Sequence, residues 1–501
     1  MSSITRRTMV GGGMMMAFGA LAPSLVTGAF GEEAPAVGFE PDADFVPGGG
    51  SFADPALAGG WTGTPADIAR VGGSTMPLSE VNRRRQAYLD TQVDFVKEDG
   101  TVIPAVYVKM RALIHTYGMG CGNTPSDTAF DFIVSHFTED EAQAYIDMPM
   151  GVTFTPFDFC VKSGRPIEEC QSLCEMFAAA GFLIHGTSPE GDYYHHIPFF
   201  QGVVEYSGFV NRLSHEIDPA AFSVGIMGSD WLFEGNDMEN SGTPTFYAIP
   251  LNEDIVSDGG GILPYDDIMR IIDATNNFAI APCACRLGRA YKGGVEDLPT
   301  VEEFTTGEHE DYFSPLCNLR VETCLQLGEE ADYWVERGFA RKISKEDAKR
   351  FMRRSAEDGF ILQSNFSKYS GTICSCHSAT CNILDQWRSL GDADTIGSGR
   401  AFEQISHYTL EVDLDACVKC GACAERCPMN SITMDGEHNG EGGFPKVDAA
   451  CFRCGQCAYI CPASARKLAA RPQEMNCELP KNFLDDSNMK AAYRFEHGVI
   501  F

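Results

Sequence analysis

The carboxyl end of the chain carries two copies of one cysteine spacing. The first copy is Cys417, Cys420, Cys423 and Cys427, the second is Cys451, Cys454, Cys457 and Cys461, and a proline follows the last cysteine of each. Three thiolates spaced in this way can bind three corners of one cubane, while the cysteine before proline points toward a second cubane. The pattern therefore predicts two [4Fe-4S] clusters with crossed ligands, Cys461 joining the first triplet and Cys427 the second. Zinc or disulfides, the competing interpretations, require neither the doubled triplet nor the Cys-Pro endings.

The segment from about Tyr408 to Lys467 resembles the bacterial two-cluster ferredoxins on these cysteines and prolines. The resemblance covers roughly an eighth of the chain. It implies a ferredoxin-like domain at residues 396–470 and one-electron transfer as its chemistry.

Seven more cysteines lie between Pro282 and Leu384. They are Cys283, Cys285, Cys317, Cys324, Cys374, Cys376 and Cys381. Neighbouring Cys-x-Cys pairs do not easily form a disulfide with each other, and we expect all these groups in loops beside helices, where thiolates can converge on iron. One [4Fe-4S] cluster would leave three thiols spare. Two clusters, which we favour, need eight ligands, so that His377 or an open iron site must complete the set; a hydrogen-bonded loop histidine is the competing role for His377.

This middle region also resembles a group of iron-sulfur proteins of anaerobic bacteria with a winged-helix-like front part. The resemblance rests on Cys283 and Cys285 with Arg286, on Cys324 with Leu325, and on the later cysteine-rich loop. The number of thiols, rather than this resemblance, leads us to expect one or two additional [4Fe-4S] clusters in this region. Arg286, Arg289 and Lys292 would raise the potential of a nearby cluster or, alternatively, form a solvated basic loop. We interpret Cys160, Cys170 and Cys174, as well as Cys121 and Cys477, as structural thiols.

The composition excludes several other functions. The chain has 501 residues, enough for about three domains, and a net charge of −32. This charge repels nucleic acid and anionic membrane surfaces and suits a basic protein partner. The glycine runs at 11–13, 48–50 and 259–261 lack the dinucleotide fingerprint, so that a nicotinamide or flavin site is unsupported.

The amino terminus resembles a twin-arginine export signal, here assigned to residues 1–30. Arg6 and Arg7 precede a weakly polar Gly/Met/Ala/Leu run that reaches about Leu25. The resemblance implies a protein exported to the periplasm or the extracytoplasmic face of the membrane. No later segment approaches the roughly 18 uninterrupted apolar residues of a membrane span. Residues 31–76, rich in Gly, Pro and Ala, are predicted to form a linker.

The elements that must position the cysteines indicate an α+β multidomain protein. Residues 77–210 should form a winged-helix-like domain, with helices that begin at Thr138, Thr155 and Pro166 and strands at 182–185 and 193–197. Residues 211–395 should form an α/β cysteine-rich domain with strands at 246–251 and 278–281. In it we expect helices from near 264 past 272, from 325 to 337, and from 344 to 359. Residues 471–501 form a tail without recognisable chemistry.

Together these features favour an exported iron-sulfur electron carrier of anaerobic respiration over a self-contained enzyme. Its partner would be a membrane quinol-linked module, a cytochrome or a reductase, with no catalytic acid or base required. One alternative is a terminal reductase, because the signal, the length and the terminal clusters resemble corrinoid-dependent reductive dehalogenases. A redox-sensing DNA-binding protein is a further alternative, which export and the acidic charge oppose.

Overall fold

The structure is a computed structural model that describes residues 76–118, 120, 127–189, 191–203, 205–206, 243–251, 266–295, 297–389, 405–435, 443–448, 450–472 and 479–498. The predicted export signal lies outside these residues, as do Cys121, Cys477 and all of the predicted linker except Met76. Within the described residues, no helix has both the length and the apolar character needed to cross a membrane.

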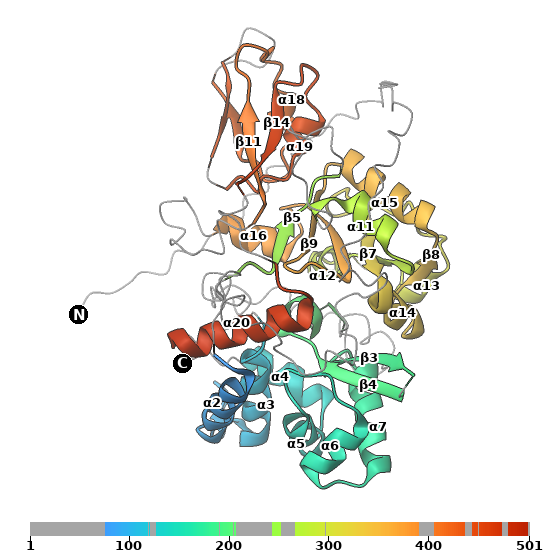
Figure 1. Ribbon diagram of the computed structural model, residues 1–501, viewed down its shortest axis with the longest axis vertical. Coiled ribbons are helices and arrows are strands. Elements are labelled where there is room, and N and C mark those ends of the chain that lie inside the picture. The colour runs from blue at the N-terminus through green and yellow to red at the C-terminus, as the bar shows by residue number, and fades with distance from the viewer. Residues whose placement is uncertain are drawn as a thin grey trace, which may run out of the picture. The chain divides into compact units, whose positions relative to one another are not determined.

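A six-stranded antiparallel sheet forms the centre of the cysteine-rich region (Figure 1). Its strands lie in the order β5 (Phe246–Ala248), β9 (Ile361–Asn365), β10 (Thr372–Cys376), β7 (Glu322–Leu327), β6 (Phe278–Pro282) and β8 (Arg341–Ile343). The helices of this region are α11 (Ile268–Ala274), α12 (Ala284–Lys292), α13 (Val301–Thr305), α14 (Gly328–Glu336), α15 (Lys345–Glu357) and α16 (Asn382–Ser389).

The two faces of this sheet bury different side chains because successive residues of a strand point to opposite sides. Ile280 of β6, Leu325 of β7 and Ile373 of β10 share one face and pack in a core with Ile268 of α11 and Phe351 of α15. The opposite face carries most of the strand cysteines. One face of the sheet therefore packs in this apolar core, and the other face carries the candidate metal ligands.

The helices before this sheet confirm several local predictions. They are α2 (Leu78–Asp90), α3 (Ala105–His115), α4 (Asp127–His136), α5 (Glu139–Asp147), α6 (Pro156–Ser163) and α7 (Ile167–Ala179). Capping boxes at Thr138 and Thr155 begin α5 and α6, as predicted. A short ribbon, β1 (Phe95–Val96) with β2 (Val102–Ile103), precedes α3, and the π-helix η2 (Phe199–Val203) ends the region.

The predicted hairpin is also present, and it is longer than expected. Strands β3 (Leu183–Ser188) and β4 (Gly191–His196) pair along their whole length, with Ser188 opposite Gly191. The observed order of elements, helices and then a hairpin, is the one that we predicted for this region. Its assignment to the winged-helix class stays a prediction.

Three local predictions in the cysteine-rich region are wrong. Residues 325–327 belong to strand β7, and the helix α14 begins only at Gly328. Leu325 and Leu327 alternate with Cys324 and Gln326, a period-two pattern that pairing with β6 and β10 stabilises as a strand. Helix α11 begins at Ile268 after the cap Asp267, later than expected, and β5 ends at Ala248.

The carboxyl-terminal part contains two small antiparallel sheets and a long helix. Strand β11 (Tyr408–Val412) pairs with β14 (Arg466–Ala470), and β12 (Ile432–Met434) pairs with β13 (Pro445–Val447). Short helices α18 (Ala422–Arg426) and α19 (Gln456–Tyr459) follow the cysteine triplets. The tail forms helix α20 (Phe483–His497), and its buried Arg494 donates to the carbonyl of His115 at 2.8 Å.

Candidate metal centres

The structure brings four of the carboxyl-terminal cysteines together as the crossed pattern predicts. Cys417, Cys420, Cys423 and Cys461 line one pocket with an empty volume of about 340 Å³, and we call them the outer set. Cys461 comes from the second copy of the spacing and lines this pocket together with the first triplet. Cys420 is exposed, which places this set at the protein surface.

The other four cysteines form a second neighbourhood, which we call the inner set. Cys427 from the first copy interacts electrostatically with Cys451, Cys454 and Cys457. Burial raises the pKa of Cys454 well above the usual thiol value and that of Cys457 to about 11. A cluster must therefore displace protons from these thiols, so that its binding depends on pH.

The backbone around both sets is shaped for thiolates that bind iron. Lys419 and Arg453, which stand at the same place in the two copies, have left-handed φ angles of 56° and 51° and turn the chain between cysteines. The amides of Ser431 and Ala465 donate to the sulfur atoms of Cys427 and Cys461, both at 3.3 Å. Such N–H···S bonds stabilise the charge of a thiolate and raise the potential of the cluster it binds. The residues present thus fit two cubanes.

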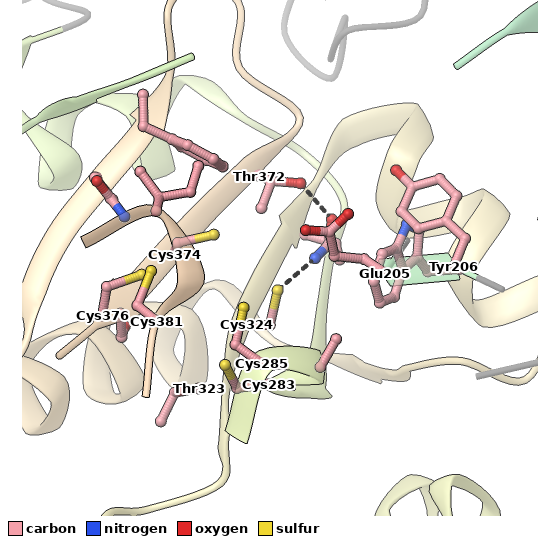
Figure 2. A pocket seen from close by; sticks show the side chains of 17 residues that line it. Glu205, Tyr206, Cys283, Cys285, Thr323, Cys324, Thr372, Cys374, Cys376 and Cys381 are labelled. Carbon is pink, nitrogen blue, oxygen red and sulfur yellow. Dashed lines mark hydrogen bonds between the residues drawn. The ribbon is translucent and has the colours of Figure 1, made fainter. Parts of the chain in front are cut away.

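Six of the seven middle cysteines line a second, larger pocket, the six-thiol pocket (Figure 2). They are Cys283, Cys285, Cys324, Cys374, Cys376 and Cys381, around an empty volume of about 610 Å³. Figure 2 shows Cys374, Cys376 and Cys381 on one side and Cys283, Cys285 and Cys324 on the other. The seventh, Cys317, does not line this pocket and lies in the turn before β7.

The sheet explains how distant cysteines reach this pocket. Cys374 and Cys376 are two residues apart in β10, so they project from the same face of the sheet. Cys324 of the neighbouring strand β7 lines the pocket with them. Our expectation that all the middle cysteines lie in loops is therefore wrong, because these three lie in strands. Cys283 and Cys285 stand at the junction of β6 and α12, and Cys381 precedes α16.

The thiols of the six-thiol pocket form a continuous series of contacts. In order they are Cys283, Cys285, Cys381, Cys376, Cys374 and Cys324. The amide Nε2 of Gln326 donates to the sulfur of Cys324 at 3.0 Å. Contacts with Cys324 and Cys376 hold the pKa of Cys374 well above its usual range, whereas contacts with Cys374 and Cys381 lower that of Cys376 to about 6.

Arg286 is a buried cation behind the wall of this pocket, which excludes the solvated loop that we had considered for it. Its guanidinium donates to the carbonyl of Ser375 at 2.6 Å and also to Thr323, and both residues line the pocket. The contact with Cys285 and burial hold the pKa of Cys283 well above the usual thiol value, and the positive charge of Arg286 offsets part of this shift. Arg289 instead forms an ion pair with Asp385.

The ring of His377 has a local role in the loop before α16. Its Nδ1 accepts the N–H of Ala379 at 3.1 Å, and the residue is not among those that line the six-thiol pocket. Cys170 and Cys174 lie fully buried in α7, as expected of structural thiols.

The polar residues of the six-thiol pocket that sequence reasoning missed include Glu205 and Gln363. Burial raises the pKa of Glu205 to about 7, and its carboxylate accepts the N–H of Gly202 at 2.7 Å. Gln363 is fully buried in β9, opposite Cys374, and its amide has no hydrogen-bond partner among the described residues. Alternation along β9, with Gln363 between Leu362 and Ser364, was the only signal that could have indicated which face it occupies.

No three Cys, His, Asp or Glu side chains in the described part of the chain converge tightly enough for one metal ion. A single zinc ion would draw its thiolates to within about 4 Å of one another, whereas a cubane holds them farther apart. Within the described residues, the arrangement of these side chains therefore provides no site for a single metal ion.

The inner set lies next to the six-thiol pocket. The backbone N–H and hydroxyl of Ser378, in the loop between Cys376 and Cys381, donate to the carbonyl of Pro428, which follows Cys427. Gln456, beside Cys457, donates to the carbonyl of Phe360 at 2.7 Å, immediately before β9. Cys427, Cys454, Cys324 and Cys374 all pack against the same apolar core. Short covalent and hydrogen-bonded connections therefore link the two sites.

Comparison with known proteins identifies the carboxyl-terminal site. Residues 416–465 match the family of the 4Fe-4S dicluster domain, which implies [4Fe-4S] clusters bound by this part of the chain. Neither the curated proteins nor the solved structures contain a match.

Proposed function

We propose that this protein, which carries a 4Fe-4S dicluster domain at residues 416–465, passes single electrons between a redox partner and a third iron-sulfur centre in the six-thiol pocket. The proposal depends above all on the Ser378–Pro428 contact, which connects the loop of Cys376 and Cys381 to Cys427. Electrons would enter or leave at the outer set and reach the pocket through the inner set.

The arrangement of the two sets supports this order. The outer set includes the exposed Cys420, which a partner in solution could reach. Cys427 and Cys454 of the inner set instead pack against the large apolar core. Bound clusters would supply the one-electron chemistry. The chain's own residues hold the thiolates, exclude water and set each potential through N–H···S bonds and the buried Arg286 and Arg466.

The setting in which the protein works is a further part of the proposal. Arg6 and Arg7 and the apolar run after them support export, and an exported cluster protein would serve anaerobic respiration. The net charge of −32 suits a basic redox partner such as a cytochrome, or a quinol-linked module or reductase. The winged-helix-like part would provide a protein contact.

A terminal reductase is the second candidate, favoured by Glu205 and Gln363 in the six-thiol pocket. A carboxyl group whose pKa lies near 7 can donate a proton to a reduced substrate. A corrinoid absorption spectrum in the purified protein would identify the dehalogenase form of this candidate.

Iron and acid-labile sulfide analysis of anaerobically prepared protein tests the third centre. We expect clearly more than about eight irons per chain and electron paramagnetic resonance signals beyond those of the dicluster domain. The Cys376→Ser variant should fall to about eight irons and keep the dicluster signals. Wild-type protein with only eight irons would contradict the proposal.

Cys317→Ser is the matched control for this experiment. Cys317 belongs to the same group of middle cysteines but lies outside the pocket, so its replacement should leave the iron content unchanged. Circular dichroism of both variants separates a lost centre from a lost fold.

A further inference from the structure

Two of the six pocket thiols, those of Cys324 and Cys374, belong to neighbouring strands and contact each other. Strands β7 and β10 pair with Leu325 opposite Ile373, and the same register, continued by one residue, places Cys324 opposite Cys374. Opposite residues of antiparallel strands have Cα atoms about 4.5 to 5.5 Å apart, within the range of about 4.4 to 6.8 Å that a disulfide requires. These two cysteines, which we call the strand pair, can therefore form a disulfide at the ordinary separation of paired strands.

The other four thiols of the pocket are enough for one cubane. They belong to Cys283, Cys285, Cys381 and Cys376, which contact one another in this order. Figure 2 shows the sulfur atoms of Cys376 and Cys381 next to each other. One [4Fe-4S] cluster takes four thiolates, so it leaves the strand pair without iron. Because Cys374 contacts Cys376, the strand pair lies directly beside this cluster site.

The strand pair is more accessible than the deepest ligands of the cluster site. Cys324 and Cys374 are only partly buried, whereas Cys376 and Cys381 are buried. A thiol that exchanges with a disulfide must be reached by that disulfide, while a cluster ligand can be enclosed completely. The difference in burial therefore suits a division of the six thiols into ligands and reactive groups.

A glutamine amide accompanies each cysteine of the strand pair. Nε2 of Gln326 donates to the sulfur of Cys324 at 3.0 Å. Gln363 stands opposite Cys374 in β9, is fully buried, and has no hydrogen-bond partner for its side-chain oxygen or nitrogen among the described residues. A buried amide without partners is costly, so such a group generally faces a bound molecule. Gln363 lines the same pocket, where its amide could bind a substrate that approaches Cys374.

From these observations we propose that the six-thiol pocket holds one cubane on its other four thiolates, and that the strand pair beside it cycles between dithiol and disulfide to reduce a small disulfide substrate. This inference rests on the proposed function, since the third centre supplies the electrons. It requires one cluster in the pocket, rather than the two that the number of cysteines favoured.

The proposed reaction has two halves. In the first, one thiolate of the strand pair attacks the substrate disulfide, and the second thiolate then displaces the bound substrate sulfur. The strand pair becomes a disulfide, and two substrate thiols leave with the two protons of the pair. In the second half, two electrons arrive one at a time from the redox partner by way of the dicluster domain, break the S–S bond of the strand pair, and two protons from water restore its thiols.

Iron analysis of anaerobically prepared variants tests the division of the thiols. Cys324→Ser and Cys374→Ser should keep about twelve irons per chain, like the wild type, whereas Cys376→Ser should fall to about eight. A fall to about eight irons in either variant of the strand pair would make that residue a ligand and overturn the inference, with the third centre intact. Wild-type protein with about sixteen irons would also overturn the inference alone, whereas about eight would remove the third centre and the proposed function with it.

Peptide mapping of wild-type protein tests the disulfide directly. Protein reduced with dithionite and then freed of it would be treated anaerobically with hydroxyethyl disulfide, denatured and alkylated. We expect a disulfide between Cys324 and Cys374 in the mass spectra and the release of about two substrate thiols per chain. Absence of this disulfide, or formation of a different one, would overturn the inference even if the variants do not fold.

Turnover with dithionite as the electron donor tests the coupling of the strand pair to the clusters. Relative to a blank without protein, Cys374→Ser should release thiol from hydroxyethyl disulfide at least about tenfold more slowly than the wild type. Cys317→Ser is the matched control, because Cys317 does not line the pocket, and it should match the wild type. Equal turnover in these two variants would overturn the inference.

Discussion

At the scale of single residues, the two copies of the cysteine spacing differ at one buried position. Arg466 stands five residues after Cys461, at the place that Ile432 occupies after Cys427. Both side chains are buried, and Arg466 lines the pocket of the outer set while it also interacts with Cys457 of the inner set. Burial raises the pKa of Cys423 and of Cys457, and the charge of Arg466 opposes both shifts. A fixed positive charge therefore lies between the two clusters.

The charge of Arg466 should raise the reduction potentials of the dicluster domain, because a nearby cation stabilises the more negative reduced state. We expect Arg466→Met to lower the potential of at least one cluster by on the order of 50 mV. Redox titration followed by electron paramagnetic resonance measures the shift. Arg466→Lys keeps the charge and should stay close to the wild type, and an equal shift in both variants would assign Arg466 a packing role only.

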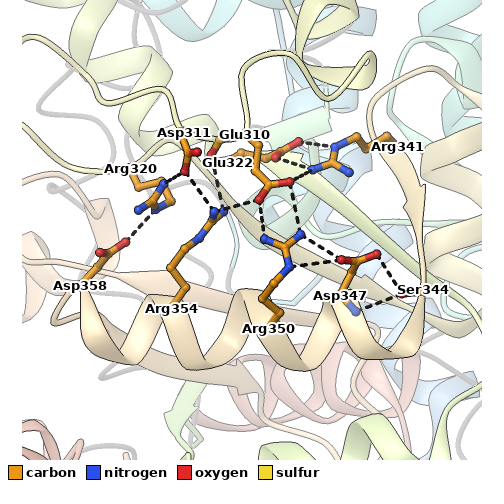
Figure 3. A network of polar contacts seen from close by, with 10 residues as sticks. All are labelled: Glu310, Asp311, Arg320, Glu322, Arg341, Ser344, Asp347, Arg350, Arg354 and Asp358. Atoms are coloured by element: carbon orange, nitrogen blue, oxygen red, sulfur yellow. Dashed lines mark hydrogen bonds and ion pairs between the residues drawn. The ribbon is translucent and has the colours of Figure 1, made fainter. Parts of the chain in front are cut away.

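At the scale of elements, a network of ion pairs and hydrogen bonds connects helix α15 to the segment before β7 (Figure 3). Glu310 accepts hydrogen bonds from Arg350 and Arg354 of α15 and from Arg341 of β8. Arg320 joins Asp311 to Asp358 at the end of α15. The network fixes the entry into β7, the strand that carries Cys324, and so supports one wall of the six-thiol pocket.

The stability given by Glu310 should be constant between pH 8 and pH 5. Hydrogen bonds from Arg350 hold the pKa of Glu310 below its ordinary value, so the carboxylate stabilises the fold above about pH 4.3 and loses this effect only as the pH falls further. Glu310→Gln should lower the free energy of unfolding by about 1 kcal/mol throughout this range. Urea unfolding under anaerobic conditions measures the difference, and a loss that disappears between pH 8 and pH 5 would refute this explanation.

At the scale of the whole molecule, the apolar cores are distributed unevenly. The central sheet lies between two large clusters of buried side chains. Among its described residues, the dicluster domain has two small groups of its own, Tyr408 with Ala458 and Leu468, and Cys423 with Ile432 and Cys457, while Met429 and Phe452 join one of the large clusters. Two of the side chains in the second group are predicted cluster ligands. The metal clusters must therefore supply much of the stability of this domain.

Removal of the clusters should open the dicluster domain before the rest of the protein. After anaerobic chelation of iron, we expect amides of β11, β12, β13 and β14 to exchange hydrogen at least about a hundredfold faster. Amides of β6 and α15, which belong to the large cores, should change far less. Hydrogen exchange with mass spectrometry makes the comparison, and equal acceleration in both regions would show that the domain does not depend on its clusters.

The sequence alone determined the parts of this protein whose causes are local. The doubled cysteine spacing predicted two thiolate triplets, because each triplet is positioned by a few neighbouring residues. The capping boxes at Thr138 and Thr155 likewise predicted where helices begin, since a cap requires only the first turn of its helix.

Only the tertiary structure decided the six-thiol pocket and its surroundings. Cys324 and Cys374 become neighbours through strand pairing across about fifty residues of sequence, and periodicity does not predict which strands pair. Pairing of β7 with β10 turned residues 325–327 into a strand, and pairing of β9 with β10 gave Gln363 its place in the pocket. The burial of Arg286 and Arg466 depends equally on contacts from distant segments, which the pattern of the sequence does not contain.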